Sequence, residues 1–133
     1  MDKESCWQKV VEARKSIHGW TFEDKSKYMF DVVLEKNPSI VAEVGVWSGL
    51  SIASFCAASL ITKTKVFAID PWCANAMSEN GYNSSLGYNQ DELDKVAINF
   101  ESNFKNIGLD ENMSIIRKTS FNASFDFADE SID

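Results

Sequence analysis

Hydrophobic positions follow two different periods along this chain. Apolar residues recur at helical spacing in three segments, which span 25–36, 52–60 and 93–107. Short runs rich in β-branched or aromatic residues lie between and after them, at 40–46, 65–69 and 113–117. Such runs are typical of strands that are covered on both faces of a parallel sheet. Because strands and helices alternate, the pattern predicts an α/β fold built from right-handed βαβ crossovers.

Polar residues and glycine set the ends of the predicted helices. Thr21 and Asp24 have the spacing of a capping box at the start of the first helix. Asn89 and Glu92 have the same spacing at the start of the third helix, and Gly108 follows its last apolar residue. We therefore expect the helices to begin close to these caps.

The remaining segments carry weaker signals. Residues 73–89 are polar without a period and are predicted to form a loop long enough to be functional. Residues 121–128 fit neither period, so a short helix and an irregular packed segment stay open. The last residues, 131–133, resemble the first step of a further strand. The chain is expected to form a single domain, with a helical lead-in at 1–37 and a core at 38–133.

Composition and charge narrow the functional classes. The 133 residues are 44% hydrophobic and 25% charged, which is typical of a globular domain, and the net charge of −7 argues against a nucleic-acid partner.

Cys6, Cys56 and Cys73 are widely separated, so no disulfide framework or zinc site is expected, which favours a cytoplasmic protein. His18 is the only histidine, so we expect no multi-histidine metal site. No signal peptide or membrane span is predicted, and therefore no membrane partner.

The turn after the first predicted strand, residues 43–51, carries the clearest functional signal. Ligands of doubly wound sheets bind at the carboxyl ends of the strands, and this turn is such an end. Gly45 permits a tight turn and close approach of a ligand, and Gly49 lets the following helix start near the strand. A dinucleotide fingerprint would need glycine where the chain has Trp47 and Leu50. The bulky indole argues against a pyrophosphate and leaves room for a smaller anion, such as a carboxylate.

Two acidic residues complete this signal. Asp70 ends the second predicted strand, close to the spacing at which an acidic residue binds ribose hydroxyls in such folds. Because it ends a strand outside the core, we expect it to serve binding rather than stability. Glu43 lies within an apolar strand, where a buried carboxylate without a partner would be costly. Together with Trp47 in the turn, these residues predict a ligand that has a ribose and a carboxylate but no diphosphate.

These motifs resemble those of class I S-adenosylmethionine-dependent methyltransferases. Residues 43–51 match the pattern E-[IV]-G-V-x-x-G-x-S of a subgroup that acts on small molecules and sugars, and residues 69–72 match its I-D-P-W. Residues 19–25 are similar to its G-W-[CT]-x-x-x-K lead-in. The resemblance covers about residues 15–133. It implies a Rossmann-like three-layer αβα sandwich with parallel strands in the order 3-2-1, truncated before strand 4.

The resemblance also implies a cofactor and roles for individual residues. The cofactor would be S-adenosylmethionine, and the acceptor a small molecule, in the subgroup commonly a sugar hydroxyl. Gly45 and Gly49 would shape the turn under the cofactor, Glu43 would approach its amino-acid end, and Asp70 would bind its ribose. Trp20 is a candidate for substrate binding. The candidate cofactor-binding residues are Glu43, Gly45, Val46, Trp47, Ser48, Gly49, Ser51, Asp70, Pro71, Trp72, Thr119 and Ser120.

Several alternatives stay open from the sequence. The subgroup usually carries its metal or proton-transfer residues after strand 4, so no catalytic residue is assigned. The chain could be a methyltransferase, truncated or completed by another chain, or a binding module without catalysis. An NAD-dependent oxidoreductase is disfavoured by Trp47. The first strand, 40–46, lacks a predicted partner on its far side, so we expect an exposed edge and association of the chain with copies of itself.

Overall fold

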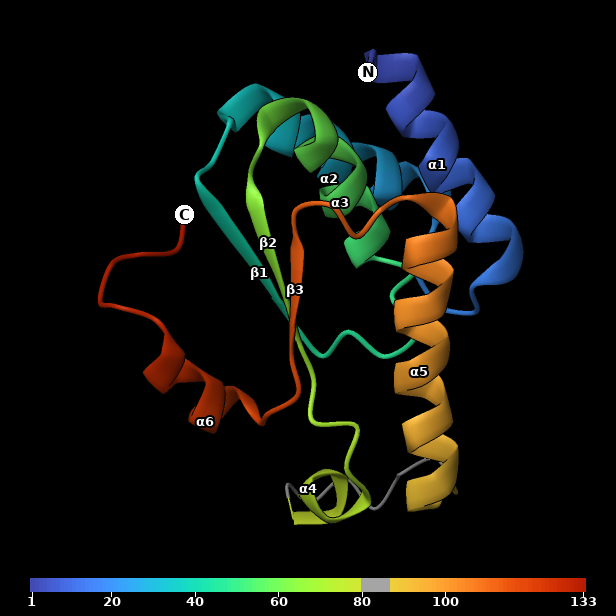
Figure 1. Cartoon of the computed structure of the whole chain (residues 1–133), viewed down its shortest axis with the longest axis vertical. Helices are drawn as coiled ribbons and strands as arrows, with labels where there is room; N and C mark the ends of the chain where they lie inside the picture. Colours follow the sequence, from blue (N-terminus) through green and yellow to red (C-terminus); the bar gives the residue numbers. More distant parts are fainter. Residues whose placement is uncertain (80–86) are drawn as a thin grey trace.

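The protein forms a parallel three-stranded sheet (Figure 1). The computed structural model describes residues 1–79 and 87–133. Its strands are β1 (Ile40–Val44), β2 (Lys65–Ile69) and β3 (Met113–Ile116), in the order β1-β2-β3. The predicted α/β class, the parallel pairing and the strand order are therefore confirmed. Strand β1 ends two residues earlier than predicted and β3 one residue earlier.

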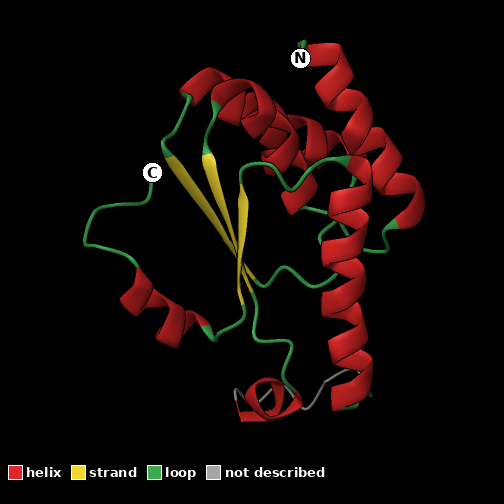
Figure 2. Ribbon diagram, in the orientation of Figure 1, coloured by secondary structure: helices red, strands yellow, loops and turns green. Residues whose placement is uncertain are grey.

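Helices lie on both sides of this sheet, but unequally. The long helices α1 (Lys3–Ser16), α2 (Glu23–Lys36), α3 (Ile52–Thr62) and α5 (Gln90–Ile107) gather on one side of the strands. The short helix α6 (Ser120–Ala123) lies on the opposite side (Figure 2). The arrangement is a Rossmann-like αβα sandwich in which one of the two helical layers is small.

Helix α3 is the centre of the core. It contacts α1, α2 and β2, and most of its side chains are buried. Many of these side chains are small, which lets the neighbouring helices approach its backbone closely. Its buried hydrophobic residues are Ile52, Ala53, Cys56, Ala57, Ala58 and Leu60. The turn between β1 and α3, residues 45–51, therefore leads into a largely buried helix.

Helix α1 lies within the predicted helical lead-in, 1–37, but the apolar pattern did not identify it as a separate helix. The Asp2 carboxylate caps it by accepting from the Ser5 N–H at 2.8 Å. Its buried residues Cys6, Val10 and Ala13 have helical spacing, but two of them are small and the stripe between them is short. The apolar signal was too weak because α1 contributes only this narrow stripe to the core.

The predicted capping box at the start of α2 is wrong. The helix begins at Glu23 with Phe22 as N-cap, and no side chain caps it. The Thr21 carbonyl oxygen instead accepts from Arg14 Nη1 at 2.9 Å. A contact with the preceding helix, rather than a local cap, thus holds the entry to α2.

The cap of α5 is as predicted. Asn89 Oδ1 accepts from the Glu92 N–H at 2.9 Å, and Glu92 Oε2 accepts from the Asn89 N–H at 2.8 Å. Gly108 ends the helix in the left-handed conformation, with φ +75°. This helix carries a strong apolar face and local caps at both ends, so local sequence was sufficient to place it.

The segment 73–89 is not entirely a loop. Residues 74–79 form helix α4 (Ala74–Glu79), so the prediction of an irregular segment is wrong there. The Gln90 side chain accepts from the Ala74 N–H at 3.1 Å and thereby ties the start of α4 to α5. Residues 80–86, on which the rest of this prediction falls, lie outside the described residues.

The chain after β3 takes the helical alternative. Helix α6 is followed by the 3-10 turn η1 (Ser124–Asp126), which answers the question left open for 121–128. Phe127 then packs its ring against that of Phe67 in β2, with centroids 5.0 Å apart. This contact places the segment against the sheet face opposite the long helices.

The outer edge of β1 has no strand beside it in the described part of the chain. The Asp133 N–H donates to the Ile40 carbonyl at 3.2 Å, and its carboxylate accepts from the N–H groups of Ser39 and Ile40. Residues 131–133 thus touch the predicted edge without forming a strand. A cavity of about 700 Å³ lies between α2, β1, α3 and these residues. Association through this edge stays a prediction.

Candidate functional site

The turn between β1 and α3, residues 45–51, lies beside the carboxyl end of β2. The sheet register pairs Val44 with Ile69, and the Gly45 N–H donates to the Ile69 carbonyl at 2.9 Å. Asp70 follows Ile69 directly. The structure therefore brings Gly45 and Asp70, the two strongest predicted positions, to the same edge of the sheet.

The two glycines of the turn have opposite surroundings. Gly45 has φ +82°, and a Cβ built on it would meet nothing within 4 Å. Gly49 has φ +92°, and a Cβ there would lie 2.5 Å from Phe100 Cδ2 and 2.8 Å from Phe104 Cε1. Gly45 leaves its backbone open to a ligand, whereas Gly49 lets α5 pack against the turn.

Asp70 links the site turn to the end of β2. Its Oδ2 accepts from the Trp47 N–H at 2.9 Å, and its Oδ1 accepts from the Trp72 N–H at 2.8 Å. Both tryptophans have positive φ, +55° and +41°, which is costly for any residue with a side chain. The carboxylate thus stabilises two unfavourable backbone positions, a structural role that sequence reasoning did not give it.

The three tryptophans near the motifs differ in exposure. Trp72 is 1% exposed, packs its ring on Phe100, and donates from Nε1 to the Trp47 carbonyl at 3.0 Å. Its side chain belongs to the core, and its carbonyl accepts from Gln90 Nε2 at 2.9 Å. Trp47 is half-buried, with its ring edge on Tyr88, and Trp20 is 77% exposed.

Glu43 is a partly buried carboxylate near the end of β1. Its Oε1 accepts from the Ser51 hydroxyl at 2.6 Å, so the side chains of these residues close the site turn. Burial raises the Glu43 pKa from 4.5 to about 7, and the Ser51 hydrogen bond and the Lys25 charge oppose this rise. The group therefore changes charge near neutral pH.

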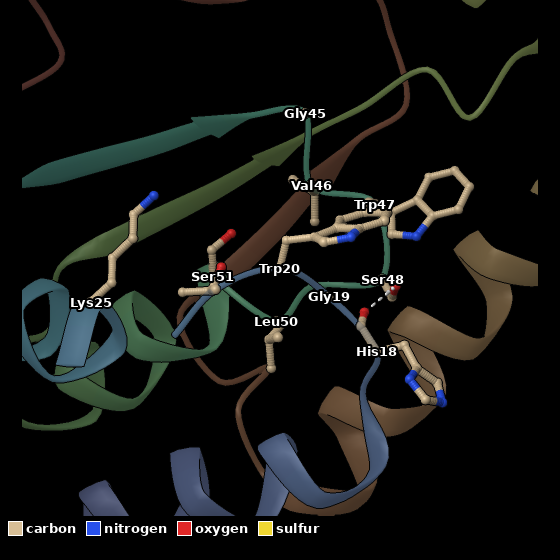
Figure 3. A pocket seen from close by; sticks show the side chains of 11 residues that line it. His18, Gly19, Trp20, Lys25, Gly45, Val46, Trp47, Ser48, Leu50 and Ser51 are labelled. Carbon is tan, nitrogen blue, oxygen red and sulfur yellow. Dashed lines mark hydrogen bonds between the residues drawn. The ribbon is translucent and has the colours of Figure 1, made fainter. Parts of the chain in front are cut away.

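A cavity of about 260 Å³ opens between this turn and the segment before α2 (Figure 3). Gly45, Trp47 and Ser51 line it from the turn, and Trp20 and Lys25 line it from the other side. Figure 3 shows Lys25 extending from α2 on one side, with the two tryptophans across from it. The cavity thus brings Trp20, the candidate for substrate binding, together with five of the candidate cofactor-binding residues, which are Gly45, Val46, Trp47, Ser48 and Ser51. Asp70 and Glu43 do not line it.

Four other predicted positions have roles within the protein. Ser48 donates its hydroxyl to the His18 carbonyl at 2.9 Å, and Val46 is buried while lining the cavity. The Pro71 carbonyl accepts from Arg117 Nε at 3.3 Å. Thr119 Oγ1 accepts from the Asn122 N–H at 3.3 Å, so Thr119 caps α6.

Ser120 and Thr119 lie beyond the end of β3, away from the cavity beside α2. The Asp70 N–H donates to the Ile116 carbonyl at 3.2 Å, so the ends of β2 and β3 are adjacent. Ser120 is exposed at the start of α6, four residues after Ile116. These two positions share the edge of the sheet with Asp70, but within 1–79 and 87–133 no hydrogen bond joins them to the turn.

Several cavity residues were not among the predicted site residues. They come from the segment that links α1 to α2, from the first turn of α2 and from the site turn, and they are His18, Gly19, Thr21, Lys25 and Leu50. Gly19, Thr21 and Lys25 belong to the G-W-T-x-x-x-K lead-in, which supports the resemblance but does not by itself predict which residues contact a ligand. Residues brought together only by the packing of α2 against α3 could not be assigned from spacing alone.

The residues present are chemically suited to S-adenosylmethionine. Each Asp70 oxygen accepts one backbone N–H, which leaves a second lone pair on each for the hydroxyls of a ribose. The open side of Gly45 lets the ligand approach the backbone. No cluster of three or more His, Cys, Asp or Glu side chains that could hold a metal occurs in 1–79 and 87–133. No helix in these ranges is long and apolar enough to cross a membrane.

Comparisons with known proteins agree with the fold. No family model matches the chain, and no curated protein matches it. The chain is similar to the crystal structure of the methyltransferase PaMTH1 from Podospora anserina with bound SAH, with a TM-score of 0.63 and 14% sequence identity. The match covers 97% of this chain and 47% of that one, so the chain spans about half the length of that methyltransferase. The chain therefore has a methyltransferase fold.

Proposed function

We propose that this chain is the cofactor-binding part of an S-adenosylmethionine-dependent methyltransferase. The observation that carries the proposal is the meeting of Gly45 and Asp70 at the carboxyl end of the sheet. Open backbone at Gly45 lies beside a carboxylate that keeps lone pairs for a ribose. The fold shared with an SAH-bound methyltransferase supports the same conclusion.

The chain's own residues would bind and orient the cofactor. When bound, S-adenosylmethionine supplies a methyl group on a positively charged sulfur, and transfer depends mainly on proximity and alignment of the acceptor. Asp70 would accept hydrogen bonds from the ribose hydroxyls, and Gly45 would let the ligand lie against the turn. Ser51 lines the cavity and donates its hydroxyl to Glu43, and this pair would serve the amino-acid end.

For the acceptor we propose a small molecule, for which a sugar hydroxyl is one class. The support is the resemblance of the motifs to that subgroup and the exposed Trp20 ring at the cavity, which offers a flat apolar surface. Methyl transfer by the whole protein is part of this proposal. The general base that would take the acceptor's proton is not assigned to any residue of this chain.

An oxidoreductase that binds NAD has less support. The second glycine of a dinucleotide fingerprint keeps backbone N–H groups free for the pyrophosphate. At this position the chain has Trp47, whose N–H already donates to Asp70 and whose ring lines the cavity. A pyrophosphate would therefore have less space at this position and could not accept a hydrogen bond from the Trp47 N–H.

Calorimetric titration tests the proposal directly. We expect the chain to bind S-adenosylhomocysteine and S-adenosylmethionine, and to bind NAD much more weakly or not at all. Gly45→Ala should weaken this binding by about tenfold or more, because a methyl group would occupy the space against which the ligand lies.

The matched control is Gly108→Ala. Gly108 also has positive φ, +75°, but ends α5 away from the cavity, and a Cβ there would lie 3.0 Å from Lys9 Nζ, the far end of a long side chain. This variant carries the same backbone strain and should bind like the parent. Binding of NAD as strong as that of S-adenosylhomocysteine would contradict the proposed function.

A further inference from the structure

Lys25 is a charged cavity residue to which the proposed function gives no role. It lies in the first turn of α2 and lines the cavity, as Figure 3 shows. Other lysines of α2 have nearby carboxylates: Lys27 pairs with Asp31 at 2.5 Å and Lys36 with Glu35 at 2.8 Å. Within 1–79 and 87–133, no ion pair or hydrogen bond is found for the Lys25 ammonium. Its charge is therefore available to a ligand in the cavity.

The opposite charge lies behind Ser51, on Glu43, which does not itself line the cavity. Ser51 lines the cavity, and its hydroxyl proton is directed to the Glu43 carboxylate at 2.6 Å. The Ser51 oxygen is thus left as an acceptor toward the cavity. The Lys25 charge acts on Glu43, which indicates that the two groups lie near each other. A cation and an acceptor pair on two sides of one small cavity are complementary to an α-amino acid.

The positive charge of Lys25 stands out because the chain as a whole is acidic. The net charge of −7 gives a field that repels anions on average, so a carboxylate needs a local positive group to bind well. Lys25 is the only lysine or arginine among the residues that line this cavity. The start of α3 adds a weaker attraction for anions on the other side of the turn.

We propose that Lys25 binds the carboxylate of the ligand's amino-acid moiety, and that the Glu43–Ser51 pair receives its ammonium group. This assignment rests on the proposed function, because it takes the ligand to be S-adenosylmethionine or its product. It makes Lys25 a residue that selects ligands carrying a free amino acid over ligands that carry only the nucleoside and thioether.

Two ligands separate this role from a general effect on the site. S-adenosylhomocysteine carries the amino acid, whereas methylthioadenosine has the same nucleoside and a thioether without it. Lys25→Met should weaken S-adenosylhomocysteine about ten- to a hundredfold, the range for a hydrogen bond to a charged group, and leave methylthioadenosine within about twofold. Lys25→Arg, which keeps the charge, should restore most of the affinity.

Lys36→Met is the matched control. It removes a lysine from the same helix, but Lys36 is exposed at the other end of α2 and lies outside this cavity. It should change the affinity for neither ligand. Calorimetry of both ligands on the full chain gives each value.

The outcomes separate the two proposals. A wild-type chain that binds neither ligand overturns the proposed function and this assignment with it. A wild-type chain that binds S-adenosylhomocysteine, with Lys25→Met binding it equally well, overturns only the assignment of Lys25. A Lys25→Met variant that weakens both ligands to the same extent also overturns it, because the loss would then not concern the amino acid.

Discussion

The two halves of the β1–α3 turn are held by different physics. The first half, around Gly45, faces open space, and a polar side chain fixes its geometry: the Asp70 carboxylate accepts from the Trp47 N–H. The second half, at Gly49, is pressed against α5, and apolar packing fixes it. The comparison teaches that two glycines four residues apart in one motif can have opposite surroundings, one with open space beside its backbone and one packed against the core.

Gly49→Ala should have the largest effect on stability. The added methyl group would overlap the Phe100 and Phe104 rings, which costs about 1–3 kcal/mol for overpacking, and the left-handed backbone adds about 1–2 kcal/mol. We expect a loss of about 4 kcal/mol in the free energy of unfolding, measured by urea denaturation followed by circular dichroism.

Gly45→Ala is the comparison for this variant. It carries the strain of positive φ without a clash, so its loss should stay at about 1–2 kcal/mol. Equal losses for the two variants would show that the two halves of the turn are not held differently.

Asp70→Ala should have the next largest effect. It leaves the N–H groups of Trp47 and Trp72 without their acceptor, and hydrogen bonds to charged groups contribute about 1.5–3 kcal/mol. We expect a loss of about 3 kcal/mol in the free energy of unfolding, in addition to weaker binding of S-adenosylhomocysteine. Thermal denaturation and calorimetry measure the two effects separately.

Asp126→Ala is a suitable control for Asp70→Ala. Asp126 pairs only with Lys118 at the surface, a kind of contact that contributes about 0–1 kcal/mol. If Asp70→Ala lowers binding but is as stable as this control, then Asp70 serves the ligand alone and the first half of the turn is held by something else.

Glu43→Gln should have a smaller effect than Gly49→Ala and Asp70→Ala, and one that depends on pH. Because the folded-state pKa of about 7 lies above the ordinary 4.5, the folded protein holds the proton more tightly, and stability falls as pH rises from 4.5 through 7. Glutamine stays neutral, so the variant should exceed the wild type by about 2 kcal/mol at pH 8 and match it below pH 4.5. Urea denaturation across this range gives the difference.

Other carboxylates with shifted pKa values do not disturb this comparison. Lys27 lowers the pKa of Asp31, and Arg117 lowers the pKa of Asp94. Both pairs are present in the wild type and in the variant, so their contributions to the pH dependence cancel in the difference between the two proteins. If the free energies of unfolding of the two proteins differed by the same amount at all pH values, burial of the Glu43 charge would not be what destabilises the wild type.

Much of the fold could be predicted because its signals are local. The three strands, α3 and α5 followed from hydrophobic period and crossover rules, and the strand order from the resemblance to class I methyltransferases. Helices α1 and α4 could not, because α1 buries only a narrow stripe and α4 is capped by a residue of the next helix. The false capping box at Thr21 has the same origin, since a contact with Arg14 replaces the local cap.

For the site, the sequence by itself determined which residues lie at the ends of β1 and β2, because parallel strands end at one edge of the sheet. Only the tertiary structure decided what surrounds them. It buried Trp72 in the core, placed Phe100 against Gly49, and brought Lys25 to the cavity. The physical reason is that these contacts join residues of separate helices, and their distances depend on how α2 and α5 pack rather than on spacing along the chain.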